Sequence, residues 1–273
     1  DVSRDPRWGR MMESFGEDPY VNGIMGKAMV DGYQQKDDTG IAACLKHFAG
    51  YGAVNAGREY NDVEISQRTF LEQYVKPFRM ALKAKPVMVM TAFNAIDRKP
   101  ISGNKELLRD LLRDKEGFDG TVISDWGSIG QLEEQGVAAD MDEAAVQAIE
   151  AGVDIDMMSP AYMFRLEELV KNGQIPESFI DESAFRVLMM KNQLGLFENP
   201  FAGLGKSGKL TLHNREKAYQ LAGESCVLLK NEKLLPLSMK KKVIWAGPYT
   251  ASREFLSRWS IFGEHEAVET IED

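Results

Sequence analysis

Four short apolar runs alternate along this chain with segments that repeat apolar residues at helical spacing. The runs are Ile41–Leu45, Val87–Met90, Thr121–Ser124 and Val153–Met157. The first three are almost continuously apolar, which is typical of strands covered on both faces, as in a parallel sheet. Helical spacing is found within residues 70–82, 107–112 and 144–149. Strands that alternate with helices predict βαβ crossovers, and therefore an α/β fold built on a parallel sheet.

The later part of the chain is organised differently. Two further helices are predicted at Phe164–Lys171 and Ser183–Leu194. The stretch 199–209 then combines one Pro, three Gly and a Ser without periodicity, which predicts a linker. A helix near Arg215–Leu229 and a strand at Val243–Ala246 follow it. We therefore predict a first domain over residues 1–198, a linker over 199–209 and a second domain that begins in 210–273.

Composition excludes several classes of function. The chain has 33 Lys and Arg against 42 Asp and Glu, a net charge of -9, whereas a nucleic-acid-binding protein needs a basic face. No run approaches the roughly 20 apolar residues that span a bilayer. Cys44 and Cys226 lie in apolar surroundings, so we expect two buried thiols rather than a disulfide scaffold or a zinc site. We therefore expect neither a nucleic-acid partner nor a membrane partner.

Polar and aromatic residues follow the first three runs. They are Lys46-His47, Ala92-Phe93-Asn94 and Asp125-Trp126. Ligand sites of parallel α/β sheets gather at the carboxyl ends of the strands. A carboxylate, two cationic side chains and aromatic rings suit a sugar, because a carboxylate can attack an anomeric carbon and an aromatic face packs on a pyranose. Each residue also has a structural alternative: Asp125 is a suitable N-cap for a helix after Gly127.

Seven motifs, in order along the chain, resemble those of one enzyme family. They are Arg4–Arg10 with Gly16–Tyr20, Lys46–Gly52 with Gly57-Arg58, Met90–Asn94, Ile123–Trp126, Ala151–Met157, Leu194–Phe197, and Val227–Asn231 with Leu235–Leu237. Together they resemble the family 3 glycoside hydrolases, particularly bacterial β-glucosidases, over nearly the whole chain. The resemblance implies a (β/α)8-type (TIM) barrel followed by an α/β sandwich domain. This chain would then hold the later barrel strands, the linker and the beginning of the sandwich.

The resemblance also implies an activity and the residues that perform it. The family hydrolyses β-linked sugars with retention through a covalent glycosyl-enzyme, and Asp125 is the nucleophile that the resemblance implies. The residues implied in substrate binding are Arg10, Lys46, His47, Arg58 and Trp126. No metal or organic cofactor is implied, because the reaction needs only two carboxyls and water. The expected substrate is a β-glucoside or an oligosaccharide with a terminal β-linked glucosyl residue.

The family pattern continues beyond both ends of this sequence. Its acid/base Glu comes from the second domain, and we expect it beyond residue 273, while the early barrel strands are expected before Asp1. An open barrel exposes sheet edges. The chain alone is therefore predicted to be an internal fragment, marginally stable and nearly inactive.

Two positions and two alternatives bear on the substrate. Tyr51 stands where N-acetylglucosaminidases of the family carry a His, which counts against that activity. Phe93 stands where many relatives carry a Tyr that contacts the nucleophile, so one hydrogen bond is lost. A β-xylosidase or a broad β-glycosidase is the alternative within the family. A non-catalytic carbohydrate-binding fragment is the alternative from another class. Oligomeric state and localisation are left open by the sequence.

Overall fold

The computed structural model describes residues 1–35, 40–201, 204, 212–238, 240–256 and 268–271. These residues fall into two compact units, Asp1–Ser207 and Gly208–Asp273. Most of the predicted linker, 199–209, lies outside the described residues. The predicted domain limits therefore stay a prediction, and each unit is described by itself.

The first unit contains nearly all of the regular structure. Its α-helices are α1 (Pro19–Tyr33), α2 (Gln67–Thr69), α3 (Lys76–Ala81), α4 (Gln131–Glu134), α5 (Met141–Ala151), α6 (Ala161–Lys171) and α7 (Ser178–Gln193). Its π-helical segments are η4 (Phe70–Val75) and η7 (Glu106–Lys115), and its short 3-10 turns are η1 (Met11–Glu13), η2 (Tyr51–Ala53), η3 (Asn55–Gly57), η5 (Leu82–Ala84) and η6 (Ile101–Gly103). Its strands are β1 (Cys44–Phe48), β2 (Asp62–Val63), β3 (Met88–Thr91), β4 (Ala95–Ile96), β5 (Lys99–Pro100) and β6 (Thr121–Ile123).

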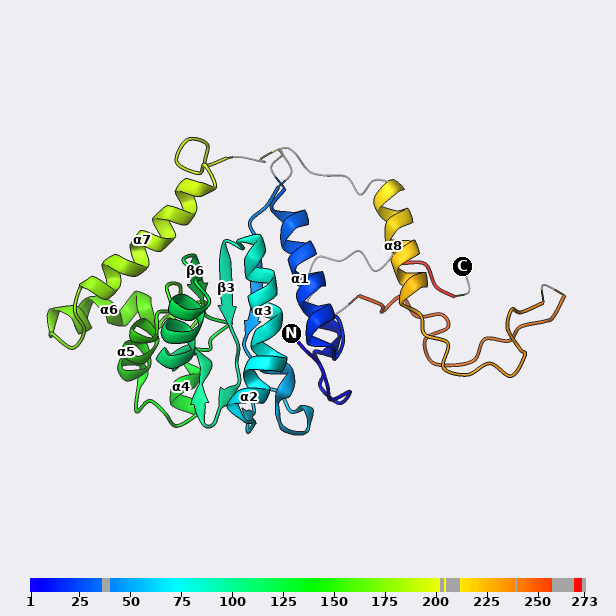
Figure 1. Cartoon of the computed structure of the whole chain (residues 1–273), viewed down its shortest axis with the longest axis horizontal. Helices are drawn as coiled ribbons and strands as arrows, with labels where there is room; N and C mark the ends of the chain where they lie inside the picture. Colours follow the sequence, from blue (N-terminus) through cyan, green and yellow to red (C-terminus); the bar gives the residue numbers. More distant parts are fainter. Residues whose placement is uncertain (36–39, 202–203, 205–211, 239, 257–267, 272–273) are drawn as a thin grey trace. The chain divides into compact units, whose positions relative to one another are not determined.

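A parallel sheet of order β1-β3-β6 forms the centre of this unit (Figure 1). Its register aligns Leu45 with Val89 and Val89 with Val122. The prediction of an α/β fold with a parallel sheet is confirmed, and the runs at 87–90 and 121–124 lie within one residue of β3 and β6. The first run lies too early in the sequence, since β1 extends to Phe48. Closure of a barrel stays a prediction.

The fourth predicted strand is reduced to a single parallel bridge between Ile123 and Ile155. A second, smaller sheet has the order β2-β4-β5 and mixes one parallel with one antiparallel pairing. Its short strands lie in the loops that follow β1 and β3. Regular pairing therefore covers only part of the last run, although the backbone of Ile155 still hydrogen-bonds to Val122 and Ser124.

Helix boundaries follow capping residues that apolar spacing alone does not show. The helical stretch predicted over 70–82 begins earlier, at α2, because the Ser66 hydroxyl accepts a hydrogen bond from the Thr69 N–H. It continues through η4 into α3. α5 begins after Asp140, whose carboxylate accepts from the Glu143 N–H, and ends at Gly152, which has φ 93°. A glycine suits that left-handed cap because it has no Cβ.

A buried ion cluster connects the sheet to α7. Asp154 lies within the last of the four runs and accepts hydrogen bonds from Arg113 at 2.7 Å, Arg186 at 2.9 Å and the Val122 N–H at 2.8 Å. Its side chain is fully buried. Burial lowers the pKa of Arg113, and the Asp154 carboxylate opposes that effect. A buried carboxylate is tolerated there because it is paired and hydrogen-bonded.

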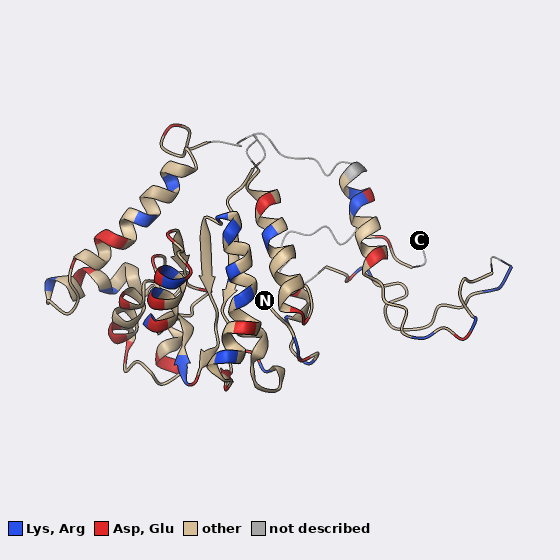
Figure 2. Ribbon diagram, in the orientation of Figure 1, with Lys and Arg blue, Asp and Glu red and all other residues tan. Residues whose placement is uncertain are grey.

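Charged residues are concentrated on the helices, and β3 carries none (Figure 2). This distribution is typical of a sheet that is covered by helices whose outer faces meet solvent. No helix among the described residues is both long enough and apolar enough to cross a membrane.

The second unit differs from expectation. α8 (Leu212–Ser225) ends before Leu229, and the described residues at Val243–Ala246 form no strand. Cys44 and Cys226 are both exposed, so the prediction of two buried thiols is wrong. Cys44 begins β1, which has β3 on one side only in the described sheet, and Cys226 follows directly after α8.

Candidate active site

The three central strands bring residues that are far apart in sequence to one edge of the sheet. Because β1, β3 and β6 are parallel, their carboxyl ends lie together. His47 belongs to the end of β1 and Asp125 follows β6, and the His47 Nε2 and Asp125 Oδ2 atoms are 3.4 Å apart. Phe93 and Asn94, which follow the intervening strand, are buried. The convergence of strand ends expected from the sequence is therefore present.

The protonation of His47 follows from its two partners. Its Nδ1 lies 2.8 Å from the Asp1 Oδ2, and its Nε2 lies 3.0 Å from the Arg10 Nη2. A carboxylate can only accept and a guanidinium can only donate, so Nδ1 carries the proton and Nε2 accepts. Burial, and then the positive charges of Arg10 and Lys46, lower the pKa of His47 to about 3. His47 is therefore a neutral imidazole with a fixed tautomer.

A second acidic residue, Glu13, holds the two cations beside the site. Arg10 donates to its two oxygens at 2.7 and 2.8 Å, and the Lys46 Nζ lies 3.6 Å from it. The hydrogen bonds from Arg10 lower the pKa of Glu13. Burial opposes the charge on Arg10, but the hydrogen bonds to Glu13 outweigh it and raise the pKa of Arg10. Both partners are therefore charged, and the fork of the guanidinium is fixed in orientation.

Asp125 is the predicted nucleophile. Its Oδ1 accepts a hydrogen bond from the Trp126 N–H at 2.7 Å, while its Oδ2 is buried and accepts none from the described residues. The nearest basic atom, His47 Nε2, already accepts from Arg10 and has no proton to give. The alternative of Asp125 as a helix N-cap is wrong, because α4 begins at Gln131 and its N-cap is Gly130.

The other two predicted binding residues are exposed. The Trp126 side chain follows Asp125 directly, and the residue is 59% exposed. Arg58 lies in the loop after β1, where its Nε donates weakly to the Asn55 carbonyl at 3.4 Å. Four of the six predicted site residues thus lie in one cluster: hydrogen bonds and ion pairs link Arg10 to His47 and, through Glu13, to Lys46, while Asp125 lies 3.4 Å from the His47 Nε2.

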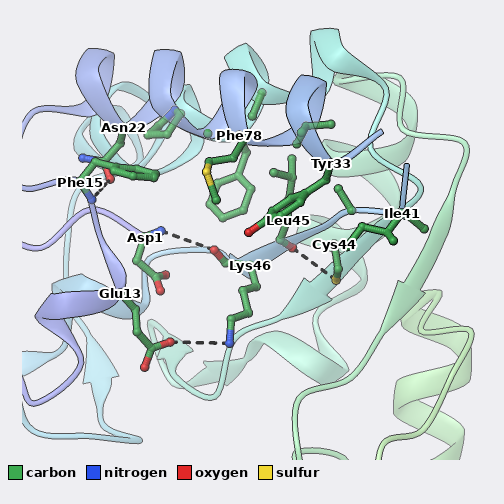
Figure 3. A pocket seen from close by; sticks show the side chains of 17 residues that line it. Asp1, Glu13, Phe15, Asn22, Tyr33, Ile41, Cys44, Leu45, Lys46 and Phe78 are labelled. Carbon is green, nitrogen blue, oxygen red and sulfur yellow. Dashed lines mark hydrogen bonds and ion pairs between the residues drawn. The ribbon is translucent and has the colours of Figure 1, made fainter. Parts of the chain in front are cut away.

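A pocket of about 320 Å³ borders this cluster (Figure 3). Asp1, Glu13 and Lys46 form its polar rim. Its floor is apolar and includes Val30 from α1 and Phe78 from α3. The charged side chains of the rim can hydrogen-bond to sugar hydroxyls, whereas the apolar floor offers no such partners, so only the rim is assigned to the candidate site.

Sequence reasoning missed three side chains of the site. Asp1 fixes the tautomer of His47, and no periodicity or spacing marks it. Glu13 is not among the predicted site residues, although two neighbouring cations call for an acidic partner. Glu59, which accepts a hydrogen bond from the Tyr51 hydroxyl, is not among them either.

No group of three or more His, Cys, Asp or Glu side chains suited to a metal ion occurs among the residues that the structure describes. Arg10 engages the Glu13 carboxylate and His47 engages that of Asp1, whereas the Asp125 Oδ2 has no donor among these residues. The chemistry that this arrangement offers is therefore that of a carboxylate nucleophile beside fixed hydrogen-bond donors.

Comparison with known proteins assigns the family. Residues 1–190 match the glycosyl hydrolase family 3 N terminal domain. The periplasmic beta-glucosidase of Salmonella typhimurium is 40% identical over 276 residues, covering 96% of this chain and 36% of that protein. A beta-xylosidase of Formosa agariphila is 34% identical, covering 87% of this chain and 35% of that protein.

A solved structure gives the same result. The crystal structure of the beta-glucosidase from Listeria innocua in complex with isofagomine matches 100% of this chain with a TM-score of 0.94 and 44% identity. The same enzyme has been solved with glucose and with laminaribiose. This chain covers 40% of that structure, so it spans between about a third and two fifths of the length of these relatives. On these grounds the chain is a member of glycosyl hydrolase family 3, and its residues 1–190 correspond to the N-terminal domain of that family.

Proposed function

We propose that this chain is the nucleophile-bearing part of a longer retaining β-glycosidase that hydrolyses terminal β-linked glucosyl residues. The observation that carries the proposal is the Asp125 carboxylate at the strand ends. One of its oxygens accepts no hydrogen bond from the described residues, while Arg10, Lys46 and His47 are fixed around the same edge of the sheet. A carboxylate that is not fully engaged by donors keeps more of its basicity, which favours its action as a nucleophile.

The proposed reaction has two displacements. An Asp125 oxygen forms a bond to the anomeric carbon as the glycosidic bond breaks, and a carboxylic acid protonates the departing oxygen. The same acid, now a carboxylate, then takes a proton from water, whose oxygen attacks the anomeric carbon and releases Asp125. Retention requires the second carboxyl at roughly 5–5.5 Å from the first. We expect that residue in the part of the protein beyond residue 273.

Substrate binding is assigned to the residues around Asp125. Arg10 and Lys46 are positively charged and can donate hydrogen bonds to sugar hydroxyls through N–H groups that Glu13 does not occupy. Arg58 and Trp126 are exposed in the segments that follow β1 and β6, and an indole face suits the apolar face of a pyranose. His47 is fully buried with both nitrogens engaged, so its part in substrate binding is to orient Arg10 beside Asp125.

A mechanism-based label tests the proposal. A 2-deoxy-2-fluoro-β-glucoside with a dinitrophenolate leaving group needs no acid assistance, so it isolates the nucleophile. The whole protein and this chain are incubated with it, and the adduct is located by peptide mass. We expect an adduct on the peptide that contains Asp125 in the whole protein and none on the chain alone. If a folded whole protein cleaves β-glucosides but labels another peptide, the nucleophile is not Asp125.

A second candidate is supported by the relatives, among which xylosidases occur. Turnover of aryl β-xylosides at a higher kcat/KM than aryl β-glucosides would favour it. Sugar binding without cleavage of either substrate would favour a non-catalytic carbohydrate-binding protein instead.

A further inference from the structure

The loop that follows β1 is built around Tyr51. This side chain is fully buried, and its ring makes edge contacts with Trp8 at 5.2 Å and with His47 at 5.4 Å between centroids. The Arg10 guanidinium carbon lies 5.2 Å from the ring centre. Tyr51 therefore touches two of the residues that surround Asp125, although it is not itself a predicted site residue.

The hydroxyl of Tyr51 has one partner on the same loop. It donates a hydrogen bond to the Glu59 Oε2. Burial, and then this hydrogen bond, raise the pKa of Tyr51, so the hydroxyl stays protonated and remains a donor. The other oxygen of Glu59 is buried and accepts no hydrogen bond from any described residue. The Tyr51 hydroxyl is thus the contact that compensates for the burial of this carboxylate.

Glu59 lies between Arg58 and Tyr60, which are both exposed. Arg58 is a predicted sugar-binding residue. Tyr60 is 52% exposed, has φ 61° and packs edge-on against Phe93, with ring centroids 4.8 Å apart. A non-glycine residue with positive φ persists only where its surroundings hold it. Two contacts hold the Tyr60 backbone in this conformation: the hydrogen bond of Glu59 to Tyr51, and the packing of the Tyr60 ring against Phe93.

The start of the loop is fixed independently. A Cβ on Gly57 would lie 2.7 Å from the Trp8 backbone nitrogen, so the loop passes against the segment that carries Arg10. Gly57 also has φ 68°, which favours glycine. Residues 57 to 60 therefore have a fixed beginning, at Trp8, and the Tyr51–Glu59 hydrogen bond sets how they continue.

We propose that the Tyr51–Glu59 hydrogen bond is a clip that positions Arg58 and Tyr60 at the mouth of the sugar site, so that Tyr51 and Glu59 are positioning residues that set affinity for substrate. The proposal rests on the proposed function, because it assumes that Arg58 binds sugar. It adds two residues that act through a loop rather than by touching the reacting atoms.

Substitutions in the whole protein separate the clip from general damage. Tyr51→Phe keeps the ring contacts and removes the hydroxyl, and Glu59→Ala removes the acceptor. We expect each to raise KM for an aryl β-glucoside and the Kd for isofagomine about tenfold, with kcat changed less than about threefold. Glu59→Gln retains an acceptor and is expected to recover most of the loss. Glu64→Ala, at an exposed position of the same region, is the matched control.

A double-mutant cycle decides whether the effect passes through Arg58. In an Arg58→Ala background, Tyr51→Phe should raise the isofagomine Kd by less than about threefold, because the residue that it positions is gone. A tenfold effect that persists in that background, or a Tyr51→Phe variant with unchanged Kd and KM, overturns the proposal.

Hydrogen exchange distinguishes failure of the clip from failure of the proposed function. Faster exchange of residues 55–61 in Tyr51→Phe, with unchanged exchange in β3, shows that the bond holds the loop. If residues 55–61 exchange faster in the variant, but the wild-type protein neither binds isofagomine nor cleaves glycosides, the proposed function is overturned. The role of the clip in substrate affinity is then overturned with it. Unchanged loop exchange overturns the clip alone.

Discussion

The two units of this chain contain similar apolar runs with different outcomes. In Asp1–Ser207, Val89 and Val122 lie in paired parallel strands and are fully buried. In the described part of Gly208–Asp273, Ile244 is 89% exposed and Leu229 92% exposed, and the run at Val243–Ala246 is not a strand. An apolar run predicts a strand only where neighbouring strands satisfy its backbone groups. Whether an apolar run forms a strand thus depends on neighbouring strands as well as on its own sequence.

Ion pairs differ between the units in the same way. Asp154 of the first unit is buried and shared by Arg113 and Arg186. The Lys230–Glu232 pair of the second unit has side chains that are more than three-quarters exposed. Buried pairs are costly to break and exposed pairs contribute little. Breaking an ion pair should therefore lower the free energy of unfolding much more in the first unit than in the second.

The largest difference is expected in catalysis. Asp125→Asn in the whole protein should lower kcat roughly 10⁴-fold, because an amide cannot form the glycosyl-enzyme. Glu224→Gln, an exposed substitution on α8, should leave kcat unchanged. Steady-state kinetics with an aryl β-glucoside measure both. If Asp125→Asn retained more than about a tenth of the activity, the nucleophile would have to be sought elsewhere.

The sequence predicted the central sheet well, for a physical reason. Strands covered on both faces are almost wholly apolar, and three such runs fell within a few residues of β1, β3 and β6. The error at β1 arose because Lys46 and His47 are polar, although His47 is fully buried. Burial of His47 depends on Asp1 and Arg10, which lie more than 35 residues away. The pattern of residues around His47 in the sequence therefore cannot predict its burial.

The site was predictable in part, and the limit has the same origin. The ends of parallel strands must converge, so the sequence alone could place Lys46, His47 and Asp125 together. Asp1 and Glu59 could not be placed in this way, because a single acidic residue in a loop has no periodicity. Their roles depend on which side chains the fold brings opposite them.

A stability comparison should show the next largest difference. Asp154→Ala leaves Arg113 and Arg186 without their shared carboxylate, and we expect the free energy of unfolding to fall by about 3–5 kcal/mol. Glu232→Ala breaks only the exposed pair and should cost about 0–1 kcal/mol. Denaturant unfolding followed by far-UV circular dichroism measures both. Equal losses would show that the buried Asp154 cluster contributes no more to stability than the exposed pair.

The pH dependence of the free energy of unfolding should show that His47, at the carboxyl ends of the strands, is buried away from water. Burial lowers the pKa of His47 to about 3, below its unfolded value of about 6.5. Between these values the unfolded chain binds more protons than the folded one, so stability is complete above about pH 6.5 and is lost as the pH falls. His47 alone should contribute a loss of about 2 kcal/mol between pH 7 and pH 5.

A variant isolates that contribution from the titration of carboxylates. His47→Gln removes the titrating group, so its stability should vary less with pH than that of the wild type, by the amount assigned to His47. An exposed, ordinary histidine at this position would give parallel pH profiles for the two proteins. Nitrogen chemical shifts of His47 should in addition report the neutral tautomer with the proton on Nδ1 at pH 5.

The smallest difference comes from one substitution made in both units. Val122→Thr places a hydroxyl in the fully buried centre of β6, and we expect a loss of about 1–3 kcal/mol. Val243→Thr makes the same change at a half-exposed position, where we expect a change within about 0.5 kcal/mol. Because the side chains are identical in both exchanges, only their surroundings can separate the two values. If Val243→Thr cost as much as Val122→Thr, the run at Val243–Ala246 would have to be buried in solution, and the contrast between the two units would fail.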